Sequence, residues 1–248
     1  MRQLRGLGRT VAQGLLRTAL VLIFVFVTMS VLAKVVPPIS TLMIRDLVML
    51  RGYDRQWIAL DATAPVLRRS IIASEDQAFC AHNGVQWDAL RTQWERWRAG
   101  EDARGASTLS MQVARNLFLW QGQSVVRKAL EVPVALWLDF VLGKRRMLEV
   151  YLNIAELGPQ LYGFEAAAQR AYGVSAGDVS ANQAGLLVAT LPLPSARDPA
   201  SPTSRQRAIA RTIAQRARGV NHLMDCLEPP PPSPSATPPV PSARPDAL

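Results

Sequence analysis

Glu75 and Asp76 are adjacent acids at the end of an apolar run, in the segment IIASEDQAFCAHNG (71–84). Thr63 with Pro65 is typical of a helix start, and apolar residues spaced by three and four then predict a helix that ends near Glu75. A carboxylate beside an apolar face and the negative end of a helix dipole should have a raised pKa, which suits a proton acceptor. The alternative interpretation is a solvated helix end, in which the two acids have no chemical role.

A second polar cluster lies in GASTLSMQVARNLFLW (105–120), where a Ser-Thr pair can cap a helix. Thr108, Gln112 and Arg115 follow at spacings of four and three, so they share one helix face. That face offers hydrogen-bond donors and one positive charge but no carboxylate. It either binds an anion such as a diphosphate or is solvated, and the residues alone leave both open.

A third cluster lies in SVVRKALEVPVALWLDF (124–140), which Ser124 can cap as a helix. Arg127 and Glu131 are four residues apart and therefore share a face. Glu131 stands in an otherwise apolar run, where a charge without water is costly. The alternatives are a functional carboxylate, a buried Arg–Glu pair and an ordinary surface ion pair.

The elements that carry these clusters are expected to be helices, because apolar residues recur at three and four between 65 and 218 and strand alternation is scarce. The segments 143–158 and 162–173 are predicted to be helices with a scaffold role. A basic helix is expected within 201–219. Its inward residues are predicted to be Ala208, Ile209, Thr212 and Ile213.

The N-terminal region predicts a membrane anchor. Residues 18–33 carry no charge, and the apolar stretch continues to residue 36, which gives a short transmembrane helix over 18–36. The arginines of the basic segment 1–17 outnumber Lys34 on the other side, so the N-terminus should stay in the cytoplasm and the remainder should cross the inner membrane. The alternative is a signal peptide cleaved after the small residues near Ala33. At the other end, the proline-rich segment 228–248 is predicted to be a disordered tail.

The 248 residues carry a net charge of +9, with a pI of about 10.5. Nucleic acid is an unlikely partner for an exported domain without zinc spacing or an RNA-binding signature, so anionic lipid or diphosphate is expected instead. Cys80 and Cys226 can form one disulfide or stay as two free thiols. His82 and His222 lie far apart without ligand partners at metal spacing, so no metal site is expected.

Four motifs occur in order: EDQAFCAHNG, GASTLSMQVARN, RKALE, and KRRMLEVYLN followed by YGFEAAAQRAYG. Together they resemble the family 51 glycosyltransferases, the peptidoglycan glycosyltransferases that polymerise lipid II. The resemblance covers about residues 45–225, and no penicillin-binding domain follows, as in the monofunctional members. It implies a mainly α, lysozyme-like glycosyltransferase domain with a membrane-dipping lobe beside the catalytic cleft.

The resemblance also implies roles for single residues. Glu75 would be the general base, and Glu131 a second essential carboxylate, either an acid or an organiser of the basic site. The residues that bind substrate and its diphosphate would be Thr108, Gln112, Arg115, Arg127 and Lys128. The supporting motif positions would be Asp76, Phe79, His82, Gly84, Ser107 and Asn116.

The implied substrates are lipid II and the growing glycan chain, joined with inversion into a β-1,4 linkage while undecaprenyl diphosphate leaves. No cofactor is required, although Mg²⁺ or Mn²⁺ assists at the diphosphate in some members of the family. The inner membrane is the other expected partner, together with divisome or other cell-wall synthesis proteins.

The membrane-dipping lobe would explain an aromatic stripe in a predicted helix that also carries Arg91, Arg96 and Arg98, as interfacial helices do. The alternative is a stripe that faces the core. The stripe consists of Trp87, Leu90, Trp94 and Trp97.

Four positions depart from the family pattern. Met111 replaces the first of two glutamines, Arg115 replaces a lysine, Ala106 replaces a glycine, and Gln123 stands where many members have an arginine. Lost donors would weaken diphosphate binding by roughly 1 to 3 kcal/mol each if nothing compensates, which can slow the enzyme. Both carboxylates are intact, so an active enzyme is expected. Two other functions stay open: a membrane-anchored lytic enzyme of the lysozyme-like fold, and a catalytically impaired cell-wall scaffold.

Overall fold

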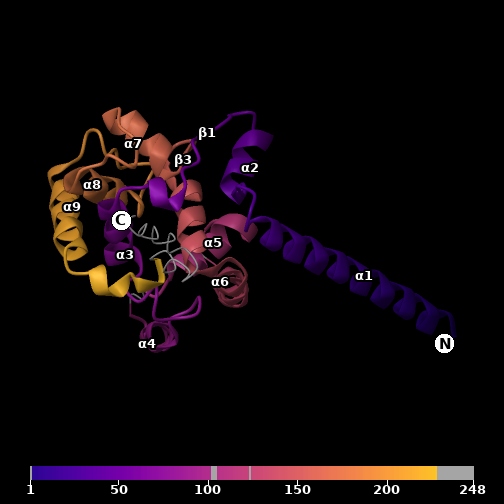
Figure 1. Ribbon diagram of the computed structural model, residues 1–248. Coiled ribbons are helices and arrows are strands. Elements are labelled where there is room, and N and C mark those ends of the chain that lie inside the picture. The colour runs from indigo at the N-terminus through magenta and orange to yellow at the C-terminus, as the bar shows by residue number, and fades with distance from the viewer. Residues whose placement is uncertain (1, 102–104, 123, 228–248) are drawn as a thin grey trace, which may run out of the picture.

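Helix α1 (Arg2–Leu32) projects away from the helical domain that holds the rest of the described chain (Figure 1). The computed structural model describes residues 2–101, 105–122 and 124–227, with side chains from residue 12 onward. The helices of the domain are α2 (Thr41–Val48), α3 (Pro65–Glu75), α4 (Trp87–Arg98), α5 (Leu109–Phe118), α6 (Val125–Ile154), α7 (Phe164–Tyr172), α8 (Ala181–Thr190) and α9 (Ser204–Ala217). The prediction of a mainly α fold is confirmed.

A small sheet joins distant parts of the chain. Its strands are β1 (Asp54–Arg55), β3 (Leu161–Tyr162) and β2 (Glu156–Gly158), in that spatial order. Strand β1 is parallel to β3, and β2 is antiparallel to it. The helix predicted over 143–158 is therefore wrong at its end, because Ala155 takes an extended conformation (φ −62°, ψ 132°) and the chain turns back into the sheet.

The segment of α1 that is long and apolar enough to cross a membrane is Ala12–Leu32, 21 residues with a mean hydropathy of 2.4. The predicted transmembrane helix over 18–36 is too long at its C-terminal end, since residues 33–36 form turns. Pro37 and Pro38 follow directly, and a residue before proline avoids helical backbone angles.

The folded domain is wider than the predicted range of 45–225. Leu42 and Met43 of α2 are buried in the core, so the domain includes residues before 45. Leu227 is also buried, which extends the domain to the end of the last 3-10 turn (Asp225–Leu227). The predicted proline-rich tail at 228–248 lies outside the described residues.

Two groups of helices make the core. Helix α5 packs along α6, whereas α3, α8 and α9 pack against one another.

The two helices predicted within 124–158 join into one element, α6, which kinks at Gly143 (φ 69°, ψ 167°). The inward face of α9 is shifted from the prediction, because Ala208 and Thr212 are exposed. Its buried residues are Gln206, Ala210, Ile213 and Ala217.

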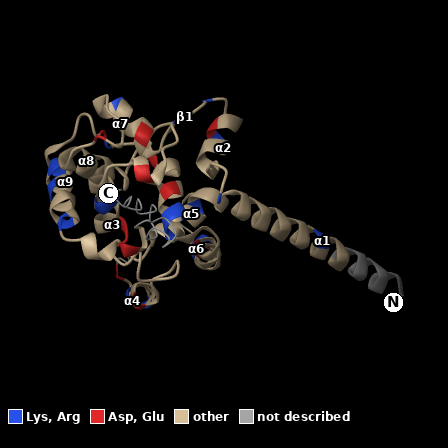
Figure 2. Ribbon diagram, in the orientation of Figure 1, with Lys and Arg blue, Asp and Glu red and all other residues tan. Residues whose placement is uncertain are grey.

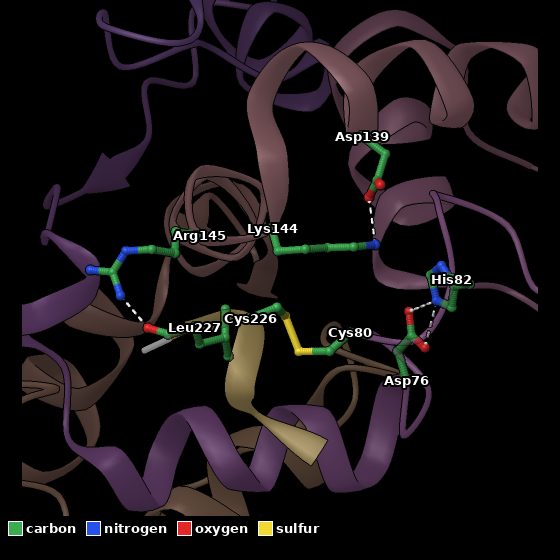
Figure 3. Close-up of a disulfide and its surroundings, with 8 residues drawn as sticks. All are labelled: Asp76, Cys80, His82, Asp139, Lys144, Arg145, Cys226 and Leu227. Carbon is green, nitrogen blue, oxygen red and sulfur yellow. Dashed lines mark hydrogen bonds and ion pairs between the residues drawn. A yellow bond between two sulfur atoms is a disulfide. The ribbon is translucent and has the colours of Figure 1, made fainter. Parts of the chain in front are cut away.

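Cys80 and Cys226 form a disulfide, with a Cα–Cα distance of 5.5 Å (Figure 3). The sequence left open whether these two cysteines are paired or free, and the structure shows that they are paired. The bond fastens the C-terminal turn to the loop that follows α3, and Arg145 of α6 donates a hydrogen bond to the carbonyl of Leu227 beside it. The disulfide therefore ties the loop after α3 to a residue 146 positions further along the chain.

The aromatic stripe lies on the surface of α4. Trp87, Trp94 and Trp97 are 61%, 53% and 53% exposed, and the rings of Trp94 and Trp97 stack with centroids 5.0 Å apart. The alternative of a core-facing stripe is therefore wrong for the three tryptophans, whereas Leu90 is half-buried and packs against the core. Large exposed aromatic side chains next to arginines fit a surface that meets lipid.

Candidate active site

Glu75 ends α3, and its carboxylate borders a cleft between α3 and the α5–α6 pair. Gln112 Nε2 of α5 donates to Glu75 Oε2 at 3.2 Å, and Ser74 Oγ donates to Glu75 Oε1 at 3.0 Å. Tyr151 of α6 holds Gln112 in turn, with a bond of 3.2 Å from its hydroxyl to Gln112 Oε1. A chain of hydrogen bonds from α6 through α5 therefore orients the carboxylate of Glu75.

The environment of Glu75 favours its neutral form. Burial raises the pKa of this carboxyl above the usual value, and the bonds from Gln112 and Ser74 oppose the shift without cancelling it. The predicted direction of the shift is confirmed. Burial also raises the pKa of Tyr151, which keeps its phenol protonated as a donor.

Asp76, next to Glu75, is buried and ties the loop after α3 to α5. The backbone N–H of Leu109 donates to Asp76 Oδ2 at 2.9 Å. His82 Nε2 lies 3.0 and 3.1 Å from the two Asp76 oxygens (Figure 3). The interpretation of these acids as a solvated helix end is wrong for Asp76, which is only 6% exposed. This contact fixes the start of α5 relative to Glu75.

Thr108 and Gly84 join the same loop to α5. The Thr108 hydroxyl accepts a bond from Met111 N at 3.1 Å, as an N-cap, and donates its proton to Gly84 O at 2.6 Å. Gly84 has a φ of +87°, and a Cβ at this position would lie 2.7 Å from the carbonyl oxygen of Ala135. The hydroxyl proton of Thr108 is thus already used within the fold, which places this residue in the support of the site.

Phe79 supports the loop after α3 from the side of the core. Its side chain is fully buried, and Lys144 Nζ lies 4.7 Å from the ring centroid. The same ammonium pairs with Asp139 at 2.8 Å (Figure 3). Phe79 therefore anchors the loop in the core and does not reach the cleft.

Three cations lie close together on α5 and α6, and of these Arg115 lines the cavity of the cleft. Arg127 and Lys128 both pair with Glu131, and the Lys128 Nζ–Glu131 Oε2 distance is 2.9 Å. Lys128 Nζ also donates to Ser107 Oγ at 2.7 Å. Glu131 is 1% exposed, so the surface ion pair considered from the sequence is wrong and the buried pair is correct. Burial, together with repulsion from Arg115 and Arg127, lowers the pKa of Lys128 to about 8.

Arg115 brings the third positive charge from the same face of α5 as Gln112. Burial lowers its pKa, whereas the nearby Tyr151 and Glu75 raise it. In the part of the chain that the structure describes, the Nε atoms of Arg115 and Arg127 are buried and have no hydrogen-bond partner. Unpaired buried donors are costly unless a ligand satisfies them, and an anion would do so here.

The cleft contains a cavity of about 450 Å³. Among the residues that line it are Glu75, Ser107, Gln112, Arg115, Asn116 and Tyr151. A second pocket of about 190 Å³ continues past Glu75 and Ser107 to Arg216 of α9. The structure therefore places a carboxylate of raised pKa between two hollows, one lined by Arg115 and the other by Arg216.

The departures from the family pattern lie partly in the core and partly at the two pockets. Met111 is fully buried in the core, so it presents no side chain to a ligand, whereas Ala106 lines the smaller pocket beside Glu75 with a methyl group. Arg115 keeps its charge at the cavity. Gln123 lies outside the described residues.

Tyr151 is the functional side chain that sequence reasoning missed, because 143–158 was predicted to be scaffold. A tyrosine in an apolar helix is usually a core residue, and no local signal shows that its hydroxyl reaches Gln112. Asn116 was predicted, and its side chain accepts a bond from Gln121 Nε2 at 3.4 Å in the cavity wall.

The transglycosylase family model matches residues 43–218 of the chain. The biosynthetic peptidoglycan transglycosylase of Rhizobium johnstonii is 50% identical over 190 residues, which cover 77% of this chain and 78% of that protein. The protein of the same name from Mesorhizobium japonicum is 48% identical over 226 residues, covering 90% of this chain and 96% of the relative. A third, from Agrobacterium fabrum, is 43% identical over 88% of this chain and 98% of its own length.

Proposed function

Since the chain belongs to the transglycosylase family, we propose that it is a peptidoglycan glycosyltransferase that polymerises lipid II into β-1,4-linked glycan strands. The observation that carries this proposal is that Glu75 and Arg115 line the same cavity. Arg115 in turn lies close enough to Arg127 and Lys128 of α6 to lower their pKa values. A hydrolase would need the acid but not this excess of positive charge. A transferase that expels a diphosphate needs both.

Glu75 acts as the general base. It takes the proton from the 4-hydroxyl of the acceptor lipid II while that oxygen forms a bond to the anomeric carbon of the growing chain. The bond from this carbon to the diphosphate oxygen breaks, which inverts an α-linked diphosphate to a β-glycoside. Gln112 and Tyr151 keep the base in position, so loss of either side chain should lower the rate constant more than the affinity.

Arg115, Arg127 and Lys128 stabilise the charge that builds on the leaving diphosphate. Glu131 pairs with two of these cations and is almost fully buried, which supports a role as their organiser and not as a proton donor. Removing it would leave two close cations without their shared counter-ion. The variant Glu131→Gln is therefore expected to lose diphosphate binding as well as activity.

A bound divalent cation does not fit these residues. Glu131 is already occupied by Arg127 and Lys128, and Glu75 is held by amide and hydroxyl donors. Among the described residues, no group of three or more His, Cys, Asp or Glu side chains is placed to hold a metal. Any Mg²⁺ or Mn²⁺ that assists would be held by the diphosphate oxygens of the substrate.

The enzyme is proposed to work from the outer face of the inner membrane, with the basic N-terminus in the cytoplasm. The helix segment Ala12–Leu32 would anchor it, and the exposed tryptophans of α4 would enter the lipid interface. Both substrates are membrane-bound lipids, so the anchor keeps the enzyme at the membrane surface in which they diffuse. Lipid II, the growing chain and the membrane are its proposed partners.

The test is polymerisation of labelled lipid II by the detergent-solubilised protein. The unaltered protein should make glycan, and Glu75→Gln should lower the rate by a factor of about 100 or more. Glu95→Gln, which removes an exposed acid of α4, is the matched control and should leave the rate unchanged. Release of soluble fragments from finished cell-wall glycan would favour the lytic enzyme instead. Binding of a lipid II analogue without any polymerisation would favour the scaffold.

A further inference from the structure

Helix α9 and the residue after it carry five arginines and no acidic residue. All five side chains are exposed, and none has an ion-pair partner within the described residues. Like charges on one short helix repel, and an anionic partner would relieve this repulsion. We call this surface the arginine face. It consists of Arg205, Arg207, Arg211, Arg216 and Arg218.

The arginine face reaches the cleft. At 100° per residue, Arg205 and Arg216 form one row and the other three arginines form a second row. The two rows are roughly 150° apart around the axis, on the two flanks of the solvent side of the helix. Arg216 lines the pocket of about 190 Å³ that also contains Glu75 and Ser107. In the second row, Arg211 and Arg218 border a separate hollow of about 360 Å³ at the start of α8. A ligand in the cleft could therefore continue onto α9.

The position of α9 argues against lipid as the partner. It lies on the side of the domain away from α1, whose far end would enter the membrane (Figure 1). Figure 2 shows Lys and Arg along this outer helix, separate from the basic residues near α5 and α6. An anionic polymer that extends away from the membrane fits this place better than a headgroup does.

We propose that the arginine face of α9 binds the anionic peptide stems of the glycan strand as the strand leaves the cleft. This inference rests on the proposed polymerase function. In that reaction the newest sugar stays on the lipid diphosphate at the membrane, so the older sugars extend away from it. Each peptide stem carries free carboxylates, and a guanidinium pairs with a carboxylate through two parallel hydrogen bonds. Arg216 meets the strand at the cleft, and Arg211 and Arg218 meet later stems.

Binding to finished strands tests the proposal without catalysis. The full-length protein in detergent is sedimented with purified, uncrosslinked glycan strands, either with intact stems or after an amidase has removed the stems. The triple variant Arg207→Gln, Arg211→Gln, Arg218→Gln should bind intact strands about tenfold more weakly, since three exposed charge pairs are lost. Binding by the unaltered protein should weaken with added salt and with removal of the stems.

The matched control removes the same number of charges from α4, as Arg91→Gln, Arg96→Gln, Arg98→Gln, and should bind strands like the unaltered protein. An unchanged unfolding midpoint of the α9 triple variant excludes misfolding. Equal binding by the α9 variant, or equal binding of stripped strands, would overturn the proposal. Tighter retention of polyglutamate than of strands would also overturn it, in favour of an acidic protein partner.

The two proposals can fail separately. If strands bind through α9 but lipid II is not polymerised, only the proposed function is lost. If lipid II is polymerised and strand binding does not depend on α9, only the arginine face loses its role.

Discussion

The lowered pKa of Lys128 predicts an alkaline limit to activity. Burial and the neighbours Arg115 and Arg127 bring this pKa to about 8, far below that of a free lysine. If the ammonium is needed at the diphosphate, the rate should fall as the pH rises through about 8. About one pH unit higher, roughly one Lys128 in ten keeps its proton, so the rate should be about tenfold below its plateau.

The variant Lys128→Arg isolates this effect, because a guanidinium keeps its charge throughout the range. Its plateau rate should be lower, by up to about tenfold, since the planar fork cannot reproduce both the Ser107 and Glu131 contacts of an ammonium. The alkaline fall near pH 8 should nevertheless disappear. The assay is polymerisation of labelled lipid II between about pH 5 and pH 10, with Lys34→Arg, a change outside the cleft, as the control.

The acid side of the same profile serves as an internal reference. Glu75 must be ionised to accept a proton, so the rate should rise with pH through its raised pKa in the unaltered protein and in Lys128→Arg alike. An alkaline fall that persists in Lys128→Arg would refute the assignment of this limb to Lys128. An acid limb that moves with the substitution would show that the two groups titrate together.

Two further predictions concern the loop that carries the site. Gly84→Ala should destabilise the fold by about 3 kcal/mol, because the residue has a positive φ and its Cβ would meet a backbone carbonyl of α6; Gly100→Ala, with a similar φ of +76° but open space around it, should cost only about 1 kcal/mol. Equal losses in chemical denaturation would mean that the close approach to α6 does not matter. Replacing Cys80 or Cys226 by serine should lower the free energy of unfolding by about 2 to 5 kcal/mol, and a reductant should lower the thermal midpoint of the unaltered protein but not that of the variants. A reductant effect that survives in Cys80→Ser would show that the disulfide is not its target.

The helices were the predictable part of the fold, because each buries one apolar stripe and the spacing of that stripe is local. Helix α3 ends at Glu75 and α5 begins after Thr108, as the capping and spacing patterns indicated. The sheet was not predictable, since β1 and β3 are too short to show an alternating pattern. The buried face of α9 was predicted wrongly because alanine and threonine are compatible with either side of a helix.

The site was predictable where its geometry lies on one helix and not where it crosses between helices. The spacing of Gln112 and Arg115 put both on one face, and both line the cavity. The contacts of Tyr151 with Gln112 and of Asp76 with the start of α5 join residues more than thirty positions apart, and no periodicity reports them. Burial likewise decided between the alternatives for Glu131, which a four-residue spacing alone could not separate.

The charges of the site support the proposed role of Glu131 as a second acid that does no proton transfer. Besides burial, Arg115 lowers the pKa of Arg127, and both arginines lower the pKa of Lys128, so a counter-charge stabilises the charged form of this cluster. Glu131 compensates one of the three and leaves two positive charges in excess. A diphosphate diester carries two negative charges and gains a third when its bond to the sugar breaks, so the cluster attracts the leaving group more strongly than the substrate. The proposed base fits the same arrangement, because the donors that hold Glu75 are the neutral groups of Gln112 and Ser74, which leave its carboxylate able to accept a proton.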